Sequence, residues 1–205
     1  MRKTVEELGI RYLVHFTAAE NLKSILTHGI VSRKDLIEQK FLFEWNDNER
    51  WDGCINASCF SIGFPNYKMF YPARTNSLEK DWVVLGIRKR VLWEKECAFC
   101  TENAAKNSMS SLTIKERSGK EALKKLFDNF PNKPSRTEMK IASHHTTNPQ
   151  AEVLIFDTVE VDNIFEVAFE NEETMIKYKH VIPEKIKVST KSSLFKGRAD
   201  YEFWR

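Results

Sequence analysis

The stretch that sets the fold class is RYLVHFTAAENLKSILTHG, residues 11–29. Its first part, residues 11–17, is rich in β-branched and aromatic side chains, which is typical of a β-strand. Its second part carries apolar residues at helical spacing, and Gly29 is a suitable stop for that helix. A strand that leads directly into a helix is therefore expected near the start of the chain.

Short predicted strands and helices follow in irregular order. Strands are expected over residues 55–62, 81–87, 152–159, 163–170 and 184–190. Helices are expected over residues 33–44, 67–70, 88–95, 118–130 and 171–181. Residues 161–163 are expected to form the turn between two of the strands. The absence of strict alternation favours an α+β fold over a doubly wound sheet, and no linker or repeat divides residues 1–205, so we expect a single domain.

Composition narrows the class of protein. Of the 205 residues, 41% are apolar and 30% are charged, as in soluble globular proteins. The net charge of +3 does not by itself predict a nucleic-acid partner. No apolar run approaches the length of a membrane span, and the N-terminal residues lack the apolar core of a secretory signal. A cytoplasmic location without a membrane partner is therefore expected.

The four cysteines raise the question of a metal site. They are Cys54, Cys59, Cys97 and Cys100, and together they could supply four thiolates to zinc. Against this, Cys59 lies in a predicted strand, and no glycine-rich knuckle surrounds the second pair. Reduced, partly buried cysteines and no bound metal are the expectation.

Two short segments place reactive side chains beside predicted elements. His15 and Thr17 share one face of a strand, so they could hold a polar ligand together; alternatively, Thr17 caps the following helix and His15 is incidental. Arg50 lies in a polar loop next to Trp51. It could bind a phosphate or carboxylate, but on its own an exposed arginine stacked on Trp51 is the better interpretation.

A third segment, NPQAEVLIF (residues 148–156), places Glu152 directly before four apolar residues of a strand. Burying an unpaired carboxylate is unfavourable, so the position needs a reason. Gln150 lies two residues earlier and faces the same way. Glu152 could accept hydrogen bonds from a sugar hydroxyl or stabilise a developing cation; the alternative is an edge-strand residue in solvent.

Four motifs occur in a specific order along the chain. They are YLVHFTAAENLKSILTHGI (12–30), RWDG with CFSIGFPNYKMFYPAR (50–53 and 59–74), CAFCTENAA (97–105) and NPQAEVLIF (148–156). In this order and spacing they resemble the DarT family, the toxins of DarT–DarG systems, which ADP-ribosylate DNA bases using NAD. The similarity extends to the tail FKGRADYEFW, residues 195–204.

The resemblance implies an ADP-ribosyltransferase fold, in which two small sheets form an NAD cleft surrounded by helices. It implies a toxin that transfers ADP-ribose from NAD to guanine or thymine in single-stranded DNA and releases nicotinamide. The alternatives are an enzyme that acts on RNA bases or on a protein target, and a non-catalytic nucleic-acid-binding module that keeps only the fold. A DarG-like macrodomain antitoxin would be the partner, a role in phage defence is implied, and the chain is expected to be a monomer.

The resemblance also assigns roles to residues. NAD binding falls to His15, Phe16, Thr17 and Ser24. Recognition of the target base falls to Asn148, Gln150, His145, Tyr67, Lys68 and Met69. Glu152 matches the catalytic glutamate, which stabilises positive charge on the ribose as nicotinamide leaves. Arg50 matches an arginine that contacts NAD and assists deprotonation of the base, although a guanidinium is an unusual proton acceptor.

Two departures bear on the acceptor. Gln150 stands where many arginine-modifying ADP-ribosyltransferases carry a second glutamate, which argues against arginine as the acceptor. The RWDG and FPNYKMF segments look more like the guanine-modifying branch of DarT relatives. An unpaired DNA strand is expected, because the acceptor atom has to enter the cleft, and Trp51, Phe64 and Tyr67 are candidates for stacking on bases.

Overall fold

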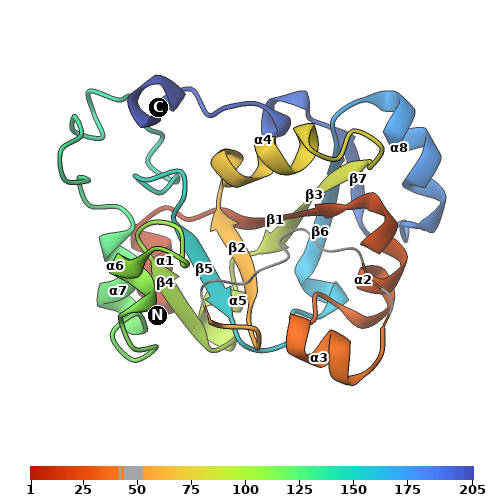
Figure 1. Cartoon of the computed structure of the whole chain (residues 1–205), viewed down its shortest axis with the longest axis horizontal. Coiled ribbons are helices and arrows are strands. Elements are labelled where there is room, and N and C mark those ends of the chain that lie inside the picture. Colours follow the sequence, from red (N-terminus) through yellow and green to blue (C-terminus); the bar gives the residue numbers. More distant parts are fainter. Residues whose placement is uncertain (42, 44–52) are drawn as a thin grey trace.

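The computed structural model of the chain describes residues 1–41, 43 and 53–205. Within them, seven strands form one sheet in the order β4-β5-β2-β1-β3-β6-β7 (Figure 1). The strands are β1 (Tyr12–Ala18), β2 (Ser58–Ile62), β3 (Trp82–Arg88), β4 (Cys97–Cys100), β5 (Glu152–Ile155), β6 (Ile164–Phe169) and β7 (Lys187–Thr190). β6 and β7 are parallel, and the other neighbouring pairs are antiparallel. The predicted α+β class is confirmed.

The two separate sheets implied by the resemblance are instead one continuous sheet. β1 and β2 join its two halves through the register pairs Leu13–Ile62 and Val14–Ser61. By contrast, β1 pairs with β3 along its whole length. The short pairing is enough to make the ladder continuous, and past these two pairs β1 and β2 are free to separate.

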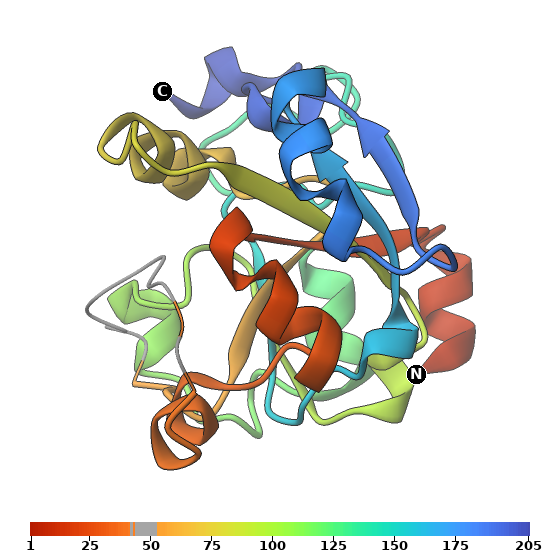
Figure 2. The same cartoon turned by 90° about the vertical axis from the view of Figure 1, so that its right-hand side faces the viewer.

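Helices cover the sheet and its ends. They are α1 (Arg2–Glu7), α2 (Leu22–His28), α3 (Arg33–Glu38), α4 (Tyr67–Thr75), α5 (Val91–Glu94), α6 (Asn107–Ser110), α7 (Gly119–Lys125) and α8 (Glu172–Tyr178). Short 3-10 helices are η1 (Ala19–Asn21), η2 (Val161–Asn163), η3 (Lys179–Val181), η4 (Ser192–Phe195) and η5 (Tyr201–Trp204). Figure 2 faces the side of the molecule on which α2 and α8 lie. Within the described ranges, no helix has both the length and the apolar character that crossing a bilayer would require.

Both faces of the central strands are buried, because successive side chains of a strand point in opposite directions. Leu13 of β1 belongs to the main core together with Leu22 of α2. The next residue, Val14, packs on the opposite face in a second cluster with Val84 and with Phe70 of α4. Complete burial of a side chain such as Phe70 contributes about 2–3 kcal/mol. This packing fixes α2 and α4 on opposite faces of β1.

Local signals located most elements but not their pairing. The expected strands and most helices are present, although the helix expected over residues 118–130 ends at Lys125. Residues 161–163 form η2 rather than a hairpin turn, and β2, β1 and β3 lie between β5 and β6 in the sheet. The helices α1 and α6 were not expected, because six and four residues are too few to show a helical period.

Gly29 ends α2, as its position in the sequence predicts. Its φ is +86°, and a Cβ at this position would lie 2.6 Å from the carbonyl oxygen of Val159. The neighbouring Ile30 bridges to Val159 in an antiparallel pair. Glycine is therefore required here for two reasons, the positive φ and the close approach of the Val159 carbonyl. This contact holds the end of α2 against the segment that follows β5.

Candidate active site

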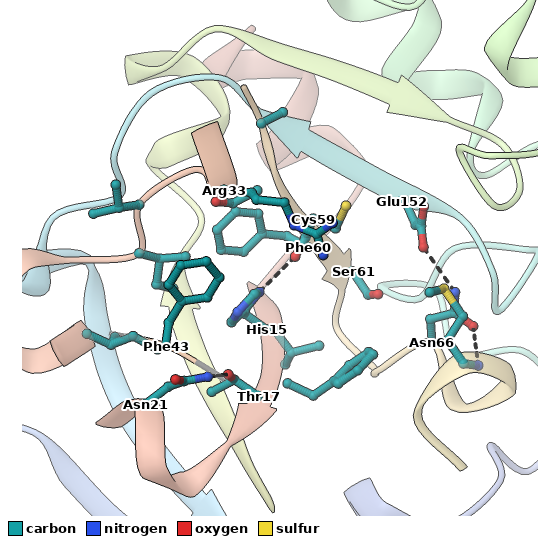
Figure 3. Close-up of a pocket in the computed structure, with 18 of the residues that line it drawn as sticks. His15, Thr17, Asn21, Arg33, Phe43, Cys59, Phe60, Ser61, Asn66 and Glu152 are labelled. Carbon is teal, nitrogen blue, oxygen red and sulfur yellow. Dashed lines mark hydrogen bonds between the residues drawn. The ribbon is translucent and has the colours of Figure 1, made fainter. Parts of the chain in front are cut away.

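A cavity of about 390 Å³ opens where β1 and β2 separate. Its walls include residues of β1, α2, α3, β2, the start of α4, residues 29–31 and 103–105, and Glu152. Figure 3 shows His15 and Thr17 on one side and Glu152 with Asn66 on the other. The volume falls in the range of about 300–1,000 Å³ that is usual for small-molecule sites.

Glu152 is the first residue of β5, and it is only 5% exposed. Its Oε1 accepts a hydrogen bond from Nδ2 of Asn66 at 3.2 Å, and its Oε2 accepts one from the backbone N–H of Ala104 at 2.9 Å. Such bonds offset the unfavourable removal of a carboxylate from water. The alternative of an edge-strand glutamate in solvent is therefore wrong, and the carboxylate forms part of the cavity wall.

Asn66 is a site residue that was not predicted from the sequence. It is 1% exposed, lines the cavity and caps α4 by accepting a hydrogen bond from the Met69 N–H at 3.3 Å. The cap was recognisable, since an asparagine before a helical segment is a standard start signal. The contact with Glu152 was not, because the two residues lie 86 positions apart.

His15 lines the cavity in a defined protonation state. Its Nδ1 lies 2.8 Å from the carbonyl oxygen of Cys59. A carbonyl can only accept, so Nδ1 carries the proton and donates it. Desolvation lowers the pKa of His15, although the hydrogen bond to the carbonyl partly opposes the shift. A neutral ring with its proton on Nδ1 leaves Nε2 as a hydrogen-bond acceptor.

Thr17 also lines the cavity, and it does not cap the following helix. Its Oγ1 accepts a hydrogen bond from Nδ2 of Asn21 at 3.0 Å. Ser24 of α2 and Phe16 of β1 line the same cavity, and the ring of Phe16 stacks on Phe70 with centroids 4.5 Å apart. The four residues expected to bind NAD are therefore gathered around one cavity.

The residues expected to recognise the base are divided. Met69 lines the cavity, whereas the other five are not among the described residues that form its walls: Asn148, Gln150, His145, Tyr67 and Lys68. The buried side chain of Asn148 is engaged in its own turn, where Oδ1 accepts from the Gln150 N–H at 2.9 Å. His145 lies beside His144 and Phe64. Lys68 donates to the carbonyl of Trp204.

Two further predictions were a catalytic arginine, Arg50, and the absence of a metal site at the cysteines. Arg50, with the neighbouring Trp51, lies outside the described residues. Arg33 of α3 also lines the cavity, and it was not among the site residues predicted from the sequence. Among the residues described, no group of three or more His, Cys, Asp or Glu side chains is arranged to hold a metal ion. Burial raises the pKa of Cys97 to about 12 and of Cys100 to about 11.

The sequence model of a family described as "ssDNA thymidine ADP-ribosyltransferase, DarT" matches residues 14–196. The chain belongs to the DarT family. This confirms the resemblance drawn from the four motifs. No curated protein matches the sequence.

Solved DarT structures share the fold of this DarT-family chain. Thermosipho africanus DarTG in complex with ADP-ribose aligns with a TM-score of 0.64 and 15% identity, over 90% of this chain and 51% of that one. Thermus sp. 2.9 DarT in complex with NAD+ aligns at 0.57 and 14%, over 91% and 98%. The same Thermus protein in complex with ADP-ribosylated ssDNA aligns at 0.60 and 11%, over 92% and 97%. This chain thus spans about half of the Thermosipho protein and nearly all of Thermus DarT.

Proposed function

We propose that this DarT-family protein transfers ADP-ribose from NAD to a base of single-stranded DNA. The observation that carries the proposal is the buried carboxylate of Glu152, held by two donors in the wall of a cavity that also contains His15 and Thr17. The solved Thermus DarT complexes with NAD+ and with ADP-ribosylated ssDNA support the same reaction.

The cavity lining fits a dinucleotide. The Nε2 of His15 and the polar side chains of Thr17, Asn21 and Ser24 offer acceptors and donors for an amide and for ribose hydroxyls. The guanidinium of Arg33 is suited to a diphosphate. NAD, when bound, supplies the ADP-ribosyl group with nicotinamide as the leaving group.

Glu152 is proposed as the catalytic carboxylate. Positive charge that develops on the ribose is stabilised most by an anion fixed nearby before the reaction begins. The bonds from Asn66 and Ala104 hold the carboxylate in one orientation. Its burial strengthens the effect, because the local dielectric constant is lower than in water.

Arg50 is proposed as the second catalytic group, on the match of RWDG to the family motif. A guanidinium remains protonated near neutral pH, so Arg50 is better suited to stabilise a base as it loses its proton than to accept that proton. It is also proposed to contact NAD. Replacing Arg50 with Ala is expected to remove most of the activity; a change confined to NAD affinity would contradict the role in deprotonation.

The acceptor side is proposed to be the loop of residues 143–150, which leads directly into Glu152 and which we name the base-facing loop. Six residues are proposed to contact the base or its neighbours: Asn148, Gln150, His145, Tyr67, Lys68 and Met69. The base is guanine or thymine. We also propose that the chain is a single domain, that it acts as a monomer, and that a DarG-like macrodomain antitoxin inhibits it.

The test is a mass measurement of nucleosides released from oligonucleotides after incubation with the protein and NAD. Single-stranded DNA and RNA that contain all bases are compared, with Glu152→Gln as the control. ADP-ribose on one DNA base, absent with the variant, is the expected result. Modification of RNA alone, or of cell protein with labelled NAD while every oligonucleotide stays unmodified, would replace the proposal with one of its alternatives.

A further inference from the structure

A buried arginine close to the end of the chain holds the base-facing loop. Arg198 is 5% exposed, and its Nη1 donates to the carbonyl oxygen of Thr146 at 2.8 Å. Its Nη2 donates to the carbonyl oxygen of Thr147 at 2.7 Å. One guanidinium thus binds two successive carbonyls of the loop that precedes Glu152.

The guanidinium is fixed from its other side. Asp200 accepts from Nε of Arg198 at 2.6 Å and from Nη2 at 2.7 Å, and Nε1 of Trp204 donates to the same carboxylate at 2.8 Å. Burial alone would raise the pKa of Asp200, but the hydrogen bonds and charge of Arg198 lower it below its ordinary value. A planar guanidinium that makes two bonds to a carboxylate and two to backbone carbonyls has little freedom to rotate.

The contact is transmitted along the chain to Glu152. The N–H of Thr147 donates to the carbonyl of Leu126 at 2.8 Å, which fixes the loop on a second side. The Oγ1 of Thr146 and the N–H of Ala151 both donate to the carbonyl of Asn148, at 3.0 Å and 3.1 Å. Continuous hydrogen bonding therefore connects the residues bound by Arg198 with the start of β5.

The segment that carries Arg198 crosses the molecule to reach this loop. Residues 192–205 follow β7 at one edge of the sheet, whereas the loop leads into β5, and β2, β1, β3 and β6 lie between these strands. Figure 1 shows the segment passing α4 toward the side of β4 and β5. Arg74 of α4 donates to the carbonyl of Phe195 on the way. The stretch matched by the family model ends at residue 196, before Arg198.

We infer that Arg198 is a positioning residue that holds the base-facing loop in register with Glu152 and so fixes where the acceptor base meets the cavity. The catalytic part of this inference rests on the proposed function. Arg198 is not among the described residues that line the cavity, so its effect should fall on the acceptor and not on NAD. A purely structural arginine would affect both equally.

Arg198→Lys is the informative variant, because lysine keeps the charge but lacks the planar fork that binds two carbonyls and a carboxylate. Arg74→Lys is the matched control. Arg74 binds the carbonyl of Phe195 and the carboxylate of Glu170, so it anchors the same segment without reaching the base-facing loop.

Three quantities are measured for each variant: amide hydrogen exchange at Thr147, Gln150 and Ala151, transfer to a single-stranded oligonucleotide, and affinity for NAD by calorimetry. Arg198→Lys should exchange faster at these amides and lose about 10- to 100-fold in transfer, since small displacements of reacting groups have effects of this size. Its NAD affinity should stay within about twofold. Arg74→Lys should change none of the three.

Each contrary outcome is decisive. Unchanged exchange in Arg198→Lys would overturn the anchoring role whatever the activity, and equal losses of transfer and NAD affinity would overturn the positioning role. If the wild-type protein transfers to no oligonucleotide, the proposed function fails, while the exchange measurement still decides the anchoring.

A second variant, Trp204→Phe, is used if Arg198→Lys does not fold. It removes one bond to Asp200 and should give the same pattern with smaller changes. Normal exchange and transfer in a folded Trp204→Phe would contradict the inference.

Discussion

The side-chain amide of Asn66 joins two parts of the site: its nitrogen donates to Oε1 of Glu152 at 3.2 Å, while its oxygen caps α4 through the Met69 N–H. The first residue of β5 and the start of α4 are thus held together by one side chain. This contact orients the carboxylate before any ligand arrives.

The two roles of Asn66, capping α4 and donating to Glu152, should be separable by mutation. Asn66→Ala removes both and should lower the free energy of unfolding by about 1 kcal/mol through loss of the cap alone. Asn66→Ser keeps a capping oxygen, but its shorter side chain has no group in the place of Nδ2, so the bond to Glu152 is lost. This variant should be more stable than Asn66→Ala while still losing about 10- to 100-fold in ADP-ribose transfer. Thermal unfolding and the oligonucleotide assay measure the two effects. Normal transfer by Asn66→Ser would exclude an orienting role.

His15 should act on NAD as a neutral acceptor. His15→Asn can keep the donor to the Cys59 carbonyl but removes Nε2, and its affinity for NAD should fall about tenfold, as for one lost hydrogen bond. The pKa of His15 is lowered by desolvation, so the affinity of the wild-type protein should not change through this residue between about pH 7 and 8. Calorimetric titration at both pH values measures this. Binding by His15→Asn that equals the wild type would remove Nε2 from the site.

Gly63 should be required next to the base-facing loop. Its φ is +74°, and an added Cβ would lie 2.7 Å from Cδ2 of His145 and 3.2 Å from the carbonyl oxygen of His144. Gly63→Ala should therefore lower both stability and transfer. Gly9→Ala is the control, since Gly9 has a φ of +65° with nothing within 4 Å of the added carbon. It should show only the conformational penalty, about 1–2 kcal/mol. An equal loss of transfer in Gly63→Ala and Gly9→Ala would contradict the steric argument.

His145 predicts a pH-dependent stability. Burial and, next, the charge of His144 lower the pKa of His145 to about 4. The same side chain in the unfolded chain has a pKa near 6.5, so the unfolded state binds more protons between these values. The contribution of His145 is complete above about pH 6.5 and is lost as the pH falls toward 4. Between pH 7 and pH 5, the free energy of unfolding measured with urea should fall less for His145→Gln than for the wild type. His180→Gln, a change at an exposed histidine, serves as the control.

The sequence was most informative where a signal is local. The strand and helix around His15, the stop at Gly29 and the unusual position of Glu152 can all be recognised within a few residues. The antiparallel pairing of β5 with β2 and β4, and the bond from Asn66 to Glu152, could not be predicted in this way, because they depend on contacts between distant parts of the chain. Asn148 shows a second limit: its residue type suggests a role in base recognition, but it does not reveal that its Oδ1 accepts a hydrogen bond from the Gln150 N–H within the same turn.

Residues 192–205, which cross the molecule from β7 to the base-facing loop, matter for shortened forms of this protein. A chain ending at Thr190 would retain all seven strands, Asn66 and Glu152, but would lack Arg198 and Asp200. Such a fragment would lose the bonds that hold the base-facing loop, and it would also uncover Val14 and Phe70, because the buried Phe195 packs with them in one cluster. A frameshift or a proteolytic cut just beyond β7 should therefore reduce transfer and stability together.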